Sequence, residues 1–315
     1  MSASSGTPFR AALVQLRAGR AIQPNLDQAE ALIRQAARGG AQYVQTPENT
    51  ALMELEPELV LKQVQPEDES VPLARLRALA GELGIWLHVG SLGIKIDAAR
   101  VANRSYLLDP HGEIAARYDK LHMFDVDLAN GESYRESQYY GPGAKAVLAD
   151  LPWGRLGMTI CYDLRFPALY RALATAGANL IAIPAAFTKQ TGQAHWHVLV
   201  RARAIETGAF VFAATQGGLH ENGRETFGHS MIVSPWGEIL AEAGEDPGVV
   251  FADIDLALSG EARARIPALK HGRPFEIELA GARKALRGRR RRDPVRAHLR
   301  RWTRLRRLVL VGRLL

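Results

Sequence analysis

The sequence predicts an α/β protein whose sheets are covered by helices. Apolar runs typical of buried strands alternate with helical segments over roughly 250 residues. No Pro-, Gly- or Ser-rich linker interrupts this alternation, so we expect one large domain that ends where the composition changes, near 275–282. The chain has 315 residues, of which 47% are hydrophobic and 23% charged. These values are ordinary for a globular protein with a sizeable core.

The amino-terminal half begins with an apolar segment, 9–16, that suits a buried strand. A helix over 25–38 follows, with Asn25 as its expected N-cap and Gly39 as its stop. Residues 105–120 contain two alternating runs around an Asp-Pro-His-Gly turn, which predicts a hairpin. Between the first helix and this hairpin we expect a strand, a helix and a strand, over 41–49, 71–83 and 85–93.

The carboxyl-terminal half continues the alternation of strands and helices. A helix over 194–208 is expected to end at Gly208, and a hairpin is expected around the Pro-Trp-Gly turn within 228–240. The other predicted strands are 154–163, 178–187, 209–218 and 248–256, and a further helix is predicted over 165–177.

The net charge of +7 divides unevenly between the body of the chain and its carboxyl terminus. Residues 283–313 contain 13 Arg and one Lys against one acid, a net charge of +13. The rest of the chain has 26 basic and 32 acidic residues and therefore a charge of −6. Only the terminus is a candidate for contact with nucleic acid or an anionic membrane.

The cysteine content and the amino terminus restrict the class of protein. The single cysteine, Cys161, excludes an intrachain disulfide and any site built from several thiolates. No apolar run approaches the ~20 residues that span a bilayer, and the first residues do not resemble a signal peptide, so we expect a cytoplasmic protein. Neither a dinucleotide-binding glycine motif nor a P-loop is present, and we expect no cofactor and no metal.

Cys161 lies where an α/β fold can place a nucleophile. It ends a predicted strand and precedes a predicted helix. At such a turn the thiol is exposed near the positive end of the helix, and both features favour a thiolate. The alternative is a small buried structural residue, which is the commonest role of a free cysteine.

A thiol nucleophile requires a base, and the nine histidines are the usual candidates. His195 and His197 lie two residues apart on a predicted helix, so they do not share a face and make a poor metal pair. His122 and His229 lie near loops, from which they could reach a site. A structural role is the alternative for each, and no spacing supports a Cys–His pair.

Carboxylates and a lysine at strand ends offer a second route to the same chemistry. Glu48 ends the second predicted strand, Lys120 ends the hairpin, and Glu136 lies in a loop. Catalytic groups of α/β folds gather at such positions because the loops there converge. Taken singly, each residue is more typical of a solvated surface.

Three segments together resemble the signature motifs of the nitrilase, or carbon–nitrogen hydrolase, superfamily. In the family's order and approximate spacing they read TPEN at 46–49, YDKLHMFDVD at 118–127 and GMTICYDLRFP at 157–167. Further similar segments are RES and PG within 135–143, TGQAHWHVLVRARAIE at 191–206 and GHSMIVSPWGEIL at 228–240. The resemblance covers about residues 8–275 and is closest to the Nit branch, which includes deaminated-glutathione amidases and omega-amidases.

The resemblance implies a fold, an assembly and a set of catalytic residues. Members of the family have a four-layer α-β-β-α sandwich and normally dimerise, so we expect a homodimer or a higher homo-oligomer. The family's catalytic residues fall on Glu48, Lys120 and Cys161, with a supporting glutamate at Glu136. Glu132, in the same loop of variable length, is a weaker candidate for the supporting role.

The implied enzyme is a cysteine-dependent amidase. Glu48 would deprotonate Cys161, and the thiolate would attack the carbonyl carbon of a small amide. Lys120 and the backbone N–H of Tyr162 would stabilise the oxyanion. Ammonia would leave, and water activated by Glu48 would hydrolyse the thioester to a carboxylate. Glu136 would orient Lys120 or the attacking water.

By resemblance, the substrate is a small carboxylate-bearing amide such as deaminated glutathione. The alternatives are α-ketoglutaramate, the substrate of an omega-amidase, and an N-carbamoyl amino acid. A guanidinium is well suited to a carboxylate, and Arg165 is the candidate. Phe187 and Thr188 follow a buried strand, where a ligand-facing loop is expected. His220 and Arg224 lie in a polar loop that would line the entrance.

The chain extends beyond the resemblance to the family. We therefore divide it into a carbon–nitrogen hydrolase domain, 1–281, and an Arg-rich tail, 282–315, that is either disordered or an amphipathic helix. A rival function follows, in which the tail binds nucleic acid or a membrane and the body is a scaffold. The enzyme requires Cys161 and tolerates loss of the tail, whereas a binding protein requires the tail and releases its ligand as salt rises. We favour the enzyme.

Overall fold

The computed structural model describes residues 8–128 and 131–279. By the contacts between its residues, the chain divides into two compact units. The first extends to Gly272, and the second begins at Arg273. All the helices and strands of the described residues belong to the first unit. The predicted Arg-rich tail, 282–315, lies outside the described residues.

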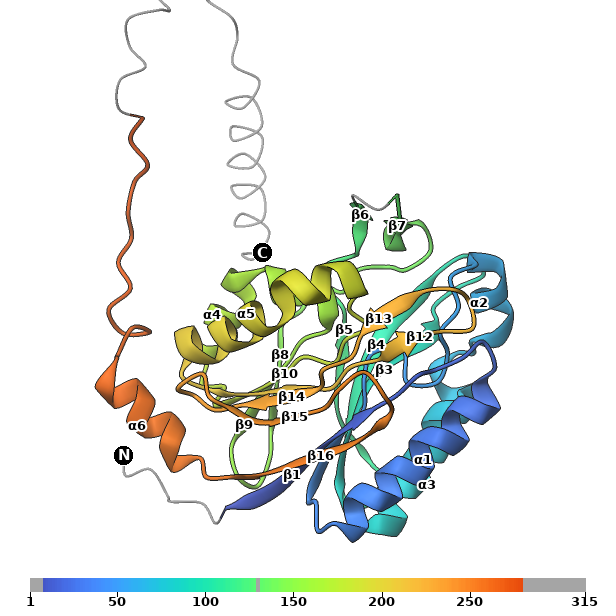
Figure 1. Ribbon diagram of the computed structural model, residues 1–315, viewed down its shortest axis with the longest axis horizontal. Coiled ribbons are helices and arrows are strands. Elements are labelled where there is room, and N and C mark those ends of the chain that lie inside the picture. Colours follow the sequence, from blue (N-terminus) through green and yellow to red (C-terminus); the bar gives the residue numbers. More distant parts are fainter. Residues whose placement is uncertain (1–7, 129–130, 280–315) are drawn as a thin grey trace, which may run out of the picture. The chain divides into compact units, whose positions relative to one another are not determined.

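Two six-stranded sheets form the centre of the first unit (Figure 1). The first sheet has the spatial order β16 (Gly248–Ile254), β1 (Phe9–Gln15), β2 (Tyr43–Gln45), β3 (Trp86–Lys95), β4 (Val101–Leu108) and β5 (Ile114–Asp119). The second has the order β15 (Ile239–Glu242), β14 (Met231–Val233), β11 (Phe210–Ala213), β10 (Leu180–Ala182), β9 (Arg155–Met158) and β8 (Val147–Asp150). The central strands of each sheet are parallel to one another, and the outer pairs are antiparallel.

Strand β1 shows how one strand serves two cores. Successive side chains of a strand point to opposite faces of its sheet. Ala11 and Leu13 therefore pack in the core that the two sheets share, whereas Ala12 and Val14 pack in a second core with helices α1 (Ile22–Arg38) and α3 (Val71–Leu83). A continuous apolar run, rather than an alternating one, is the sequence signature of such a strand.

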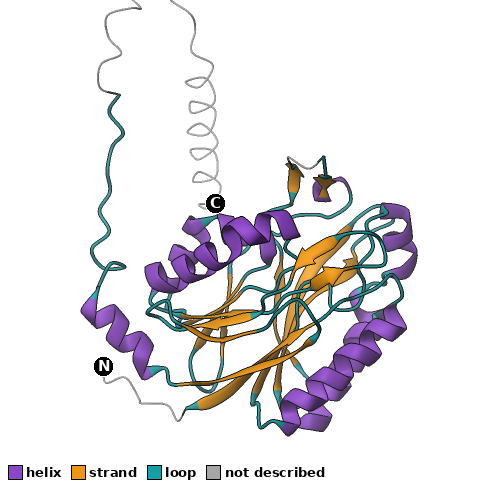
Figure 2. Cartoon of the chain, in the orientation of Figure 1, coloured by secondary structure: helices purple, strands orange, loops and turns teal. Residues whose placement is uncertain are grey.

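Helices α4 (Pro167–Thr175) and α5 (Lys189–Thr207) cover the outer face of the second sheet, through side chains that include Tyr170 and Trp196. Figure 2 shows the strands enclosed between the two helical layers. The four-layer α-β-β-α sandwich that the resemblance to the nitrilase superfamily implies is therefore confirmed. Each described helix is too short or too polar to span a bilayer.

Most predicted elements are present, and one predicted cap is wrong. The hairpin is formed by β4 and β5, and α3 has the predicted bounds with Ser70 as its N-cap. Helix α1 begins three residues earlier than expected, at Ile22, so Asn25 lies inside it and caps nothing. The Asn25 side chain instead bonds to the backbone of Gly19, at 2.7 and 2.9 Å, and of Ala51, at 2.9 Å, and so ties two loops to the helix.

Several short elements were not anticipated from the sequence. They include the hairpins β6 (Asp125–Asp127) with β7 (Ser133–Arg135) and β12 (Gly217–Leu219) with β13 (Glu225–Phe227). Helices α2 (Pro57–Gln63) and α6 (Ala257–Arg265) were also missed. Each is only three to nine residues long, too short for a periodic apolar pattern to stand out.

Two buried histidines are held in the neutral form by the fold. The ring nitrogens of His88 lie 3.0 Å from the Tyr43 hydroxyl and 2.7 Å from Ser105 Oγ. Those of His220 lie 2.8 Å from the Ala18 carbonyl and 2.7 Å from Thr226 Oγ1. Burial disfavours the imidazolium and lowers the pKa of His88 to about 3 and that of His220 to about 4.

These depressed pKa values predict loss of stability in acid. Below about pH 6.5 a histidine of the unfolded chain binds a proton that the folded protein excludes, so each group lowers the free energy of unfolding by up to roughly 1.4 kcal/mol per pH unit. The loss should run from pH 6.5 down to about 4 for His220. Urea unfolding between pH 7 and 4 measures it. His220→Gln should make the dependence shallower, and the exposed His111→Gln should not change it.

Candidate active site

Four of the sequence-predicted residues meet at one cavity. Glu48 follows β2, Lys120 follows β5 and Cys161 follows β9, so the first sheet supplies two of these side chains and the second sheet supplies one. Glu136 begins a short 3₁₀ helix, Glu136–Gln138, directly after β7. All four line the same cavity, which has a volume of about 280 Å³. Residues up to 113 positions apart in sequence (Glu48 and Cys161) are thus brought together by strand ends.

Lys120 is the centre of a buried ionic cluster. Its ammonium donates to Glu48 Oε1 at 2.9 Å and to both carboxylate oxygens of Glu136 at 2.9 Å. The residue is only 2% exposed, and Glu48 is 3% exposed. A buried ammonium is tolerated only when carboxylates and hydrogen bonds replace its water, and here three N–H donors meet three carboxylate oxygens.

Asn103, which the sequence analysis did not single out, joins the two carboxylates of this cluster. Its side-chain Nδ2 donates to Glu48 Oε1 at 2.9 Å and to Glu136 Oε1 at 3.2 Å. Its backbone carbonyl accepts from the N–H of Lys120 at 3.0 Å. The one available signal was a polar residue within the buried strand VANRSYLL, β4. A polar side chain in such a strand needs partners, and a functional site supplies them.

The cluster sets the charge states of its members. Burial alone would lower the pKa of Lys120, but the carboxylates of Glu136 and Glu48 outweigh burial and hold that pKa well above its usual value. Burial alone would raise the pKa of Glu48, but Lys120 outweighs it and the pKa lies below its usual value. Glu48 is therefore a carboxylate at neutral pH, ready to accept a proton.

Cys161 occupies a strained turn beside Glu48. Its φ is +47°, in the left-handed region that a residue with a Cβ rarely adopts. The turn is held by the Cys161 N–H, which donates to the Pro184 carbonyl at 2.9 Å. The thiol is hydrogen-bonded to the Glu48 carboxylate, and Oε2 of Glu48 also accepts from the N–H of Ala186 at 2.9 Å. The strain thus presents the sulfur to the cavity and to the base.

The two features expected to favour a thiolate, an exposed turn and the end of a helix, are not found at Cys161, which is buried. Cys161 begins a 3₁₀ helix, Cys161–Arg165, and α4 starts only at Pro167, so no α-helix terminus lies at the sulfur. Burial and the nearby Glu48 carboxylate raise the pKa of the thiol, and Lys120 offsets only part of this. The resting residue is therefore a thiol that must lose its proton during attack.

Asp163 ties the cysteine turn to the loop that follows Lys120. It is fully buried and accepts from the Ile160 N–H at 2.8 Å and from the Tyr118 hydroxyl at 2.6 Å. It also lies 3.1 Å from the backbone nitrogen of His122 and 2.6 Å from its Nδ1. His122 therefore orients the loop and does not line the cavity, and neither does His229. Of the two alternatives considered for these histidines, the structure favours the structural role.

The predicted substrate-binding residues are only partly brought together. Tyr162, Phe187 and Thr188 line the cavity, as the sequence analysis expected. Arg165 is not among the lining residues. Its guanidinium lies 5.1 Å above the ring of Phe187, and its Nη1 lies 3.3 Å from Nδ1 of His195.

A different arginine, Arg224, faces the cavity. Of the two loop residues expected at the entrance, Arg224 lines the cavity, whereas His220 is buried and does not line it. The Arg224 guanidinium lies 5.2 Å from the ring of Tyr134 and donates through Nη2 to the Ala186 carbonyl. Its Nε is buried and, among the described residues, has no hydrogen-bond partner.

Comparison with known proteins gives the family. The carbon–nitrogen hydrolase family model matches residues 10–264. A protein of Yersinia enterocolitica named deaminated glutathione amidase is 42% identical over 268 residues, which cover 83% of this chain and 92% of that protein. The crystal structure of Saccharomyces cerevisiae Nit3, a member of branch 10 of the nitrilase superfamily, is 28% identical with a TM-score of 0.76, and the match covers 85% of this chain and 97% of Nit3.

A third relative bears on the chemistry. An amidase from Nesterenkonia sp. AN1 is 29% identical, with a TM-score of 0.70 over 82% of this chain and 98% of that one. That structure is of a Glu-to-Gln mutant and shows the result of Michael addition of acrylamide at the active-site cysteine. The present chain belongs to the carbon–nitrogen hydrolase family. It is an amidase, a cysteine-dependent hydrolase that cleaves the C–N bond of amides.

The ionic cluster predicts that removal of the Lys120 ammonium greatly lowers the free energy of unfolding. Lys120→Met would leave two buried carboxylates facing each other without a counter-charge, and should lower the free energy of unfolding by about 3–5 kcal/mol. Glu48→Gln keeps a hydrogen-bond acceptor for Lys120 and leaves Glu136 as its counter-charge, so it should cost clearly less. Chemical denaturation of the three proteins measures this. Equal stability of Lys120→Met and the parent would contradict the ionic account of the cluster.

Proposed function

We propose that Cys161 is the nucleophile, Glu48 the general base and acid, and Lys120 the stabiliser of the oxyanion. The observation that carries this proposal is a thiol hydrogen-bonded to an ionised carboxylate that also holds a buried ammonium. The Nesterenkonia amidase, which takes an adduct on its active-site cysteine, supports the role of the thiol. We further propose that the hydrolase domain ends by residue 281.

The first half-reaction forms a thioester. As the sulfur attacks the amide carbon, its proton moves to Glu48, because the raised pKa of the thiol keeps that proton on sulfur until attack. The carbonyl oxygen becomes an oxyanion close to the Lys120 ammonium. Glu48 then gives the proton to the amide nitrogen, the C–N bond breaks and the amine leaves.

Proton transfer also frees a donor for the oxyanion. In the resting site all three N–H groups of Lys120 point to Glu48 and Glu136. Protonation of Glu48 removes its charge and weakens its bond from Lys120, so one N–H can turn to the oxyanion as the charge develops there. Glu136 keeps two bonds to the ammonium throughout, and so we propose it as a positioning residue.

The second half-reaction regenerates the thiol. Glu48, a carboxylate again once the amine has left, takes a proton from water. The resulting hydroxide attacks the thioester carbon, and Lys120 stabilises the second oxyanion in the same place. The C–S bond then breaks, the sulfur takes the proton back from Glu48, and the carboxylic acid product leaves.

We propose deaminated glutathione, or an amide of the same kind, as the substrate. Relatives named deaminated glutathione amidase are 38–42% identical to this chain and match most of its length. For this substrate, the expectation that ammonia is the leaving group is wrong. In deaminated glutathione the amide nitrogen belongs to cysteinylglycine, so cleavage yields that dipeptide, whereas a primary amide such as α-ketoglutaramate yields ammonia.

Arg224 is our proposed ligand for the carboxylate of the substrate. Its buried Nε donor has no partner among the described residues, and a carboxylate in the cavity would supply one. Arg135 also lines the cavity, but its guanidinium is bonded to both oxygens of Asp127. Arg165 does not line the cavity, and we therefore prefer Arg224 to Arg165 as the ligand.

We also propose a homodimer or higher homo-oligomer, located in the cytoplasm. Large apolar side chains are exposed on the outer side of α5 and beside it, with Val198 68%, Ile205 55% and Trp236 50% exposed. Their burial between two copies would contribute to association. A free thiol nucleophile stays reduced in the cytoplasm, which supports that location. Sedimentation velocity of the full chain distinguishes a dimer from a monomer.

The covalent mechanism predicts that turnover depends on one sulfur atom. Cys161→Ala should lower the release of cysteinylglycine from deaminated glutathione by at least about a thousandfold. Quenched reactions of the parent should show a thioester on Cys161 by intact-protein mass spectrometry, and reactions of the variant should not. A parent-like thermal midpoint for the variant excludes misfolding. Turnover that survives this substitution would refute the assignment of the nucleophile.

The assignment of Arg224 predicts a change in specificity. Arg224→Gln should raise KM for deaminated glutathione and for α-ketoglutaramate by about 10- to 100-fold, the usual effect of losing a charged hydrogen bond. It should leave kcat/KM for a neutral amide such as propionamide nearly unchanged. Arg165→Gln is the matched control and should change neither. If Arg165→Gln alone raises KM for the acids, Arg165 binds the carboxylate.

Comparable turnover of propionamide or an N-carbamoyl amino acid by the parent would reject the substrate class.

A further inference from the structure

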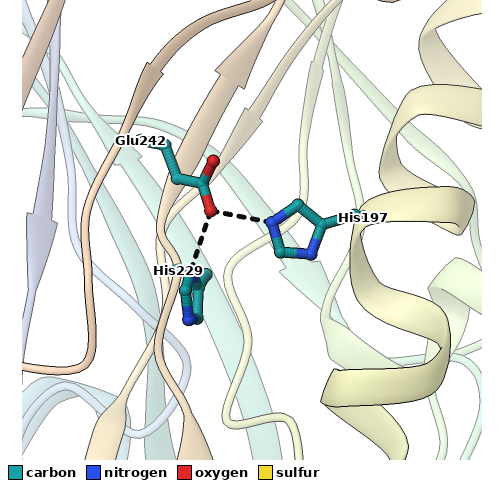
Figure 3. Close-up of side chains that lie close together, drawn as sticks. All are labelled: His197, His229 and Glu242. Carbon is teal, nitrogen blue, oxygen red and sulfur yellow. Dashed lines mark hydrogen bonds and ion pairs between the residues drawn. The ribbon is translucent and has the colours of Figure 1, made fainter.

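Two histidines and a glutamate from different elements meet on the side of α5 that faces the β14–β15 hairpin (Figure 3). His197 lies on α5, His229 lies just before β14, and Glu242 ends β15. One oxygen of Glu242, Oε1, is 2.7 Å from His197 Nε2 and 2.7 Å from His229 Nδ1. The three ligand atoms all lie within 4.8 Å of one another. None of these residues lines the cavity around Cys161.

The donor set is that of a divalent transition-metal site. Imidazole nitrogen and carboxylate oxygen are the ligands that Zn²⁺ takes in proteins, and two histidines with one glutamate leave a fourth position for water. Ligand atoms around a tetrahedral zinc ion lie about 3.3 Å apart, given metal–ligand distances of about 2.0–2.2 Å. The two 2.7 Å contacts therefore need to open by only about 0.6 Å.

The surrounding residues hold the two imidazoles in place. The His229 ring stacks on Phe227 at 4.3 Å, and the His197 ring meets the edge of Phe227 at 5.8 Å. The Trp196 indole N–H donates to the His229 carbonyl at 2.9 Å, and His229 itself has a φ of +58°. Because these contacts orient the rings before any ion arrives, binding would cost little reorganisation.

The cluster also has a path for an ion to enter. The side chains of His197, His229 and Glu242 are 36%, 27% and 30% exposed. An ion can therefore reach the site from solvent and keep a water ligand. Each imidazole would bind through the nitrogen that now faces Glu242 and would carry its proton on the other nitrogen, so both remain neutral.

We propose that His197, His229 and Glu242 form a structural binding site for Zn²⁺ or a similar divalent transition-metal ion. From the sequence alone we expect no metal, and His195 and His197 make a poor metal pair because they do not share a helix face. The partners of His197 instead come from elements far along the chain. The ion would clamp α5 to the β14–β15 hairpin. The first turns of α5 include Thr191, which lines the active-site cavity, so the clamp would stiffen one wall of that cavity.

The test measures binding of Zn²⁺ itself by the full-length chain without an affinity tag. The parent carries Cys161→Ala, because a thiol beside Glu48 would also bind zinc. Protein stripped with a chelator is dialysed against micromolar ZnCl₂, and bound metal is counted by elemental mass spectrometry. The affinity is obtained by calorimetry. We expect one Zn²⁺ per chain and a rise in thermal midpoint that MgCl₂ does not produce.

Three variants on this background decide where the ion binds. His197→Ala and Glu242→Gln should each weaken zinc binding by more than about tenfold and remove the rise in thermal midpoint. His195→Ala, which removes a histidine on the same helix outside the cluster, should bind as the parent does. Glu242→Gln retains an acceptor for both imidazoles, so it separates loss of the ion from loss of the fold. Unchanged binding in both cluster variants, or no binding by the parent, would overturn the proposal.

Discussion

A single ammonium group buried between two carboxylates constrains the arrangement of the active site. Lys120 is almost fully buried, and removing an ammonium from water is costly unless anions replace the solvent. Glu48 and Glu136 supply those anions, and Asn103 bonds to both. Because these groups come from the ends of β2 and β5, from β4 and from the loop after β7, the first sheet must hold its register for the cluster to close. The register of the first sheet therefore determines whether the Lys120 ammonium meets the carboxylates that compensate its charge.

The second sheet brings Cys161, the proposed nucleophile, to this cluster as a protonated thiol. The strained turn at Cys161 is held by Pro184 on one side and by Asp163 on the other. Asp163 also bonds to Tyr118 and His122, which flank Lys120, so one buried carboxylate aligns the two sheets at the reaction centre. Burial and Glu48 both raise the pKa of the thiol, so in the proposed mechanism the proton leaves sulfur as the substrate carbonyl accepts the new bond.

Helix α5 links the catalytic cavity to the rest of the second sheet. Thr188 and Thr191, at its amino-terminal end, lie in the cavity wall. Further along, Arg203 donates to the Leu164 carbonyl at 3.0 and 2.7 Å and so braces the turn that carries Cys161. The outer side of the same helix exposes Val198 and Ile205, and His197 faces the β14–β15 hairpin. One helix thus contacts the turn that carries Cys161, the cavity, the proposed metal site and the surface proposed for association.

Strand and helix patterns in the chain were sufficient for an α/β fold and for most long elements, whereas the four-layer sandwich and the residues that gather at the cavity followed from the resemblance to the family. Continuous apolar runs predict strands buried on both faces, and β1 has that burial because sheet and helices cover it. Glu48, Lys120 and Cys161 were found because strand ends and family motifs are contiguous in sequence. Asn25 was misassigned because a cap and a buried asparagine look alike until their partners, here Gly19 and Ala51, are known. Contacts between distant segments decided the rest: Asn103 between two glutamates, the protonated thiol, Arg224 instead of Arg165 at the cavity, and His197 beside His229. Each depends on burial or on pairing across the fold, and neither is encoded in the spacing of neighbouring residues.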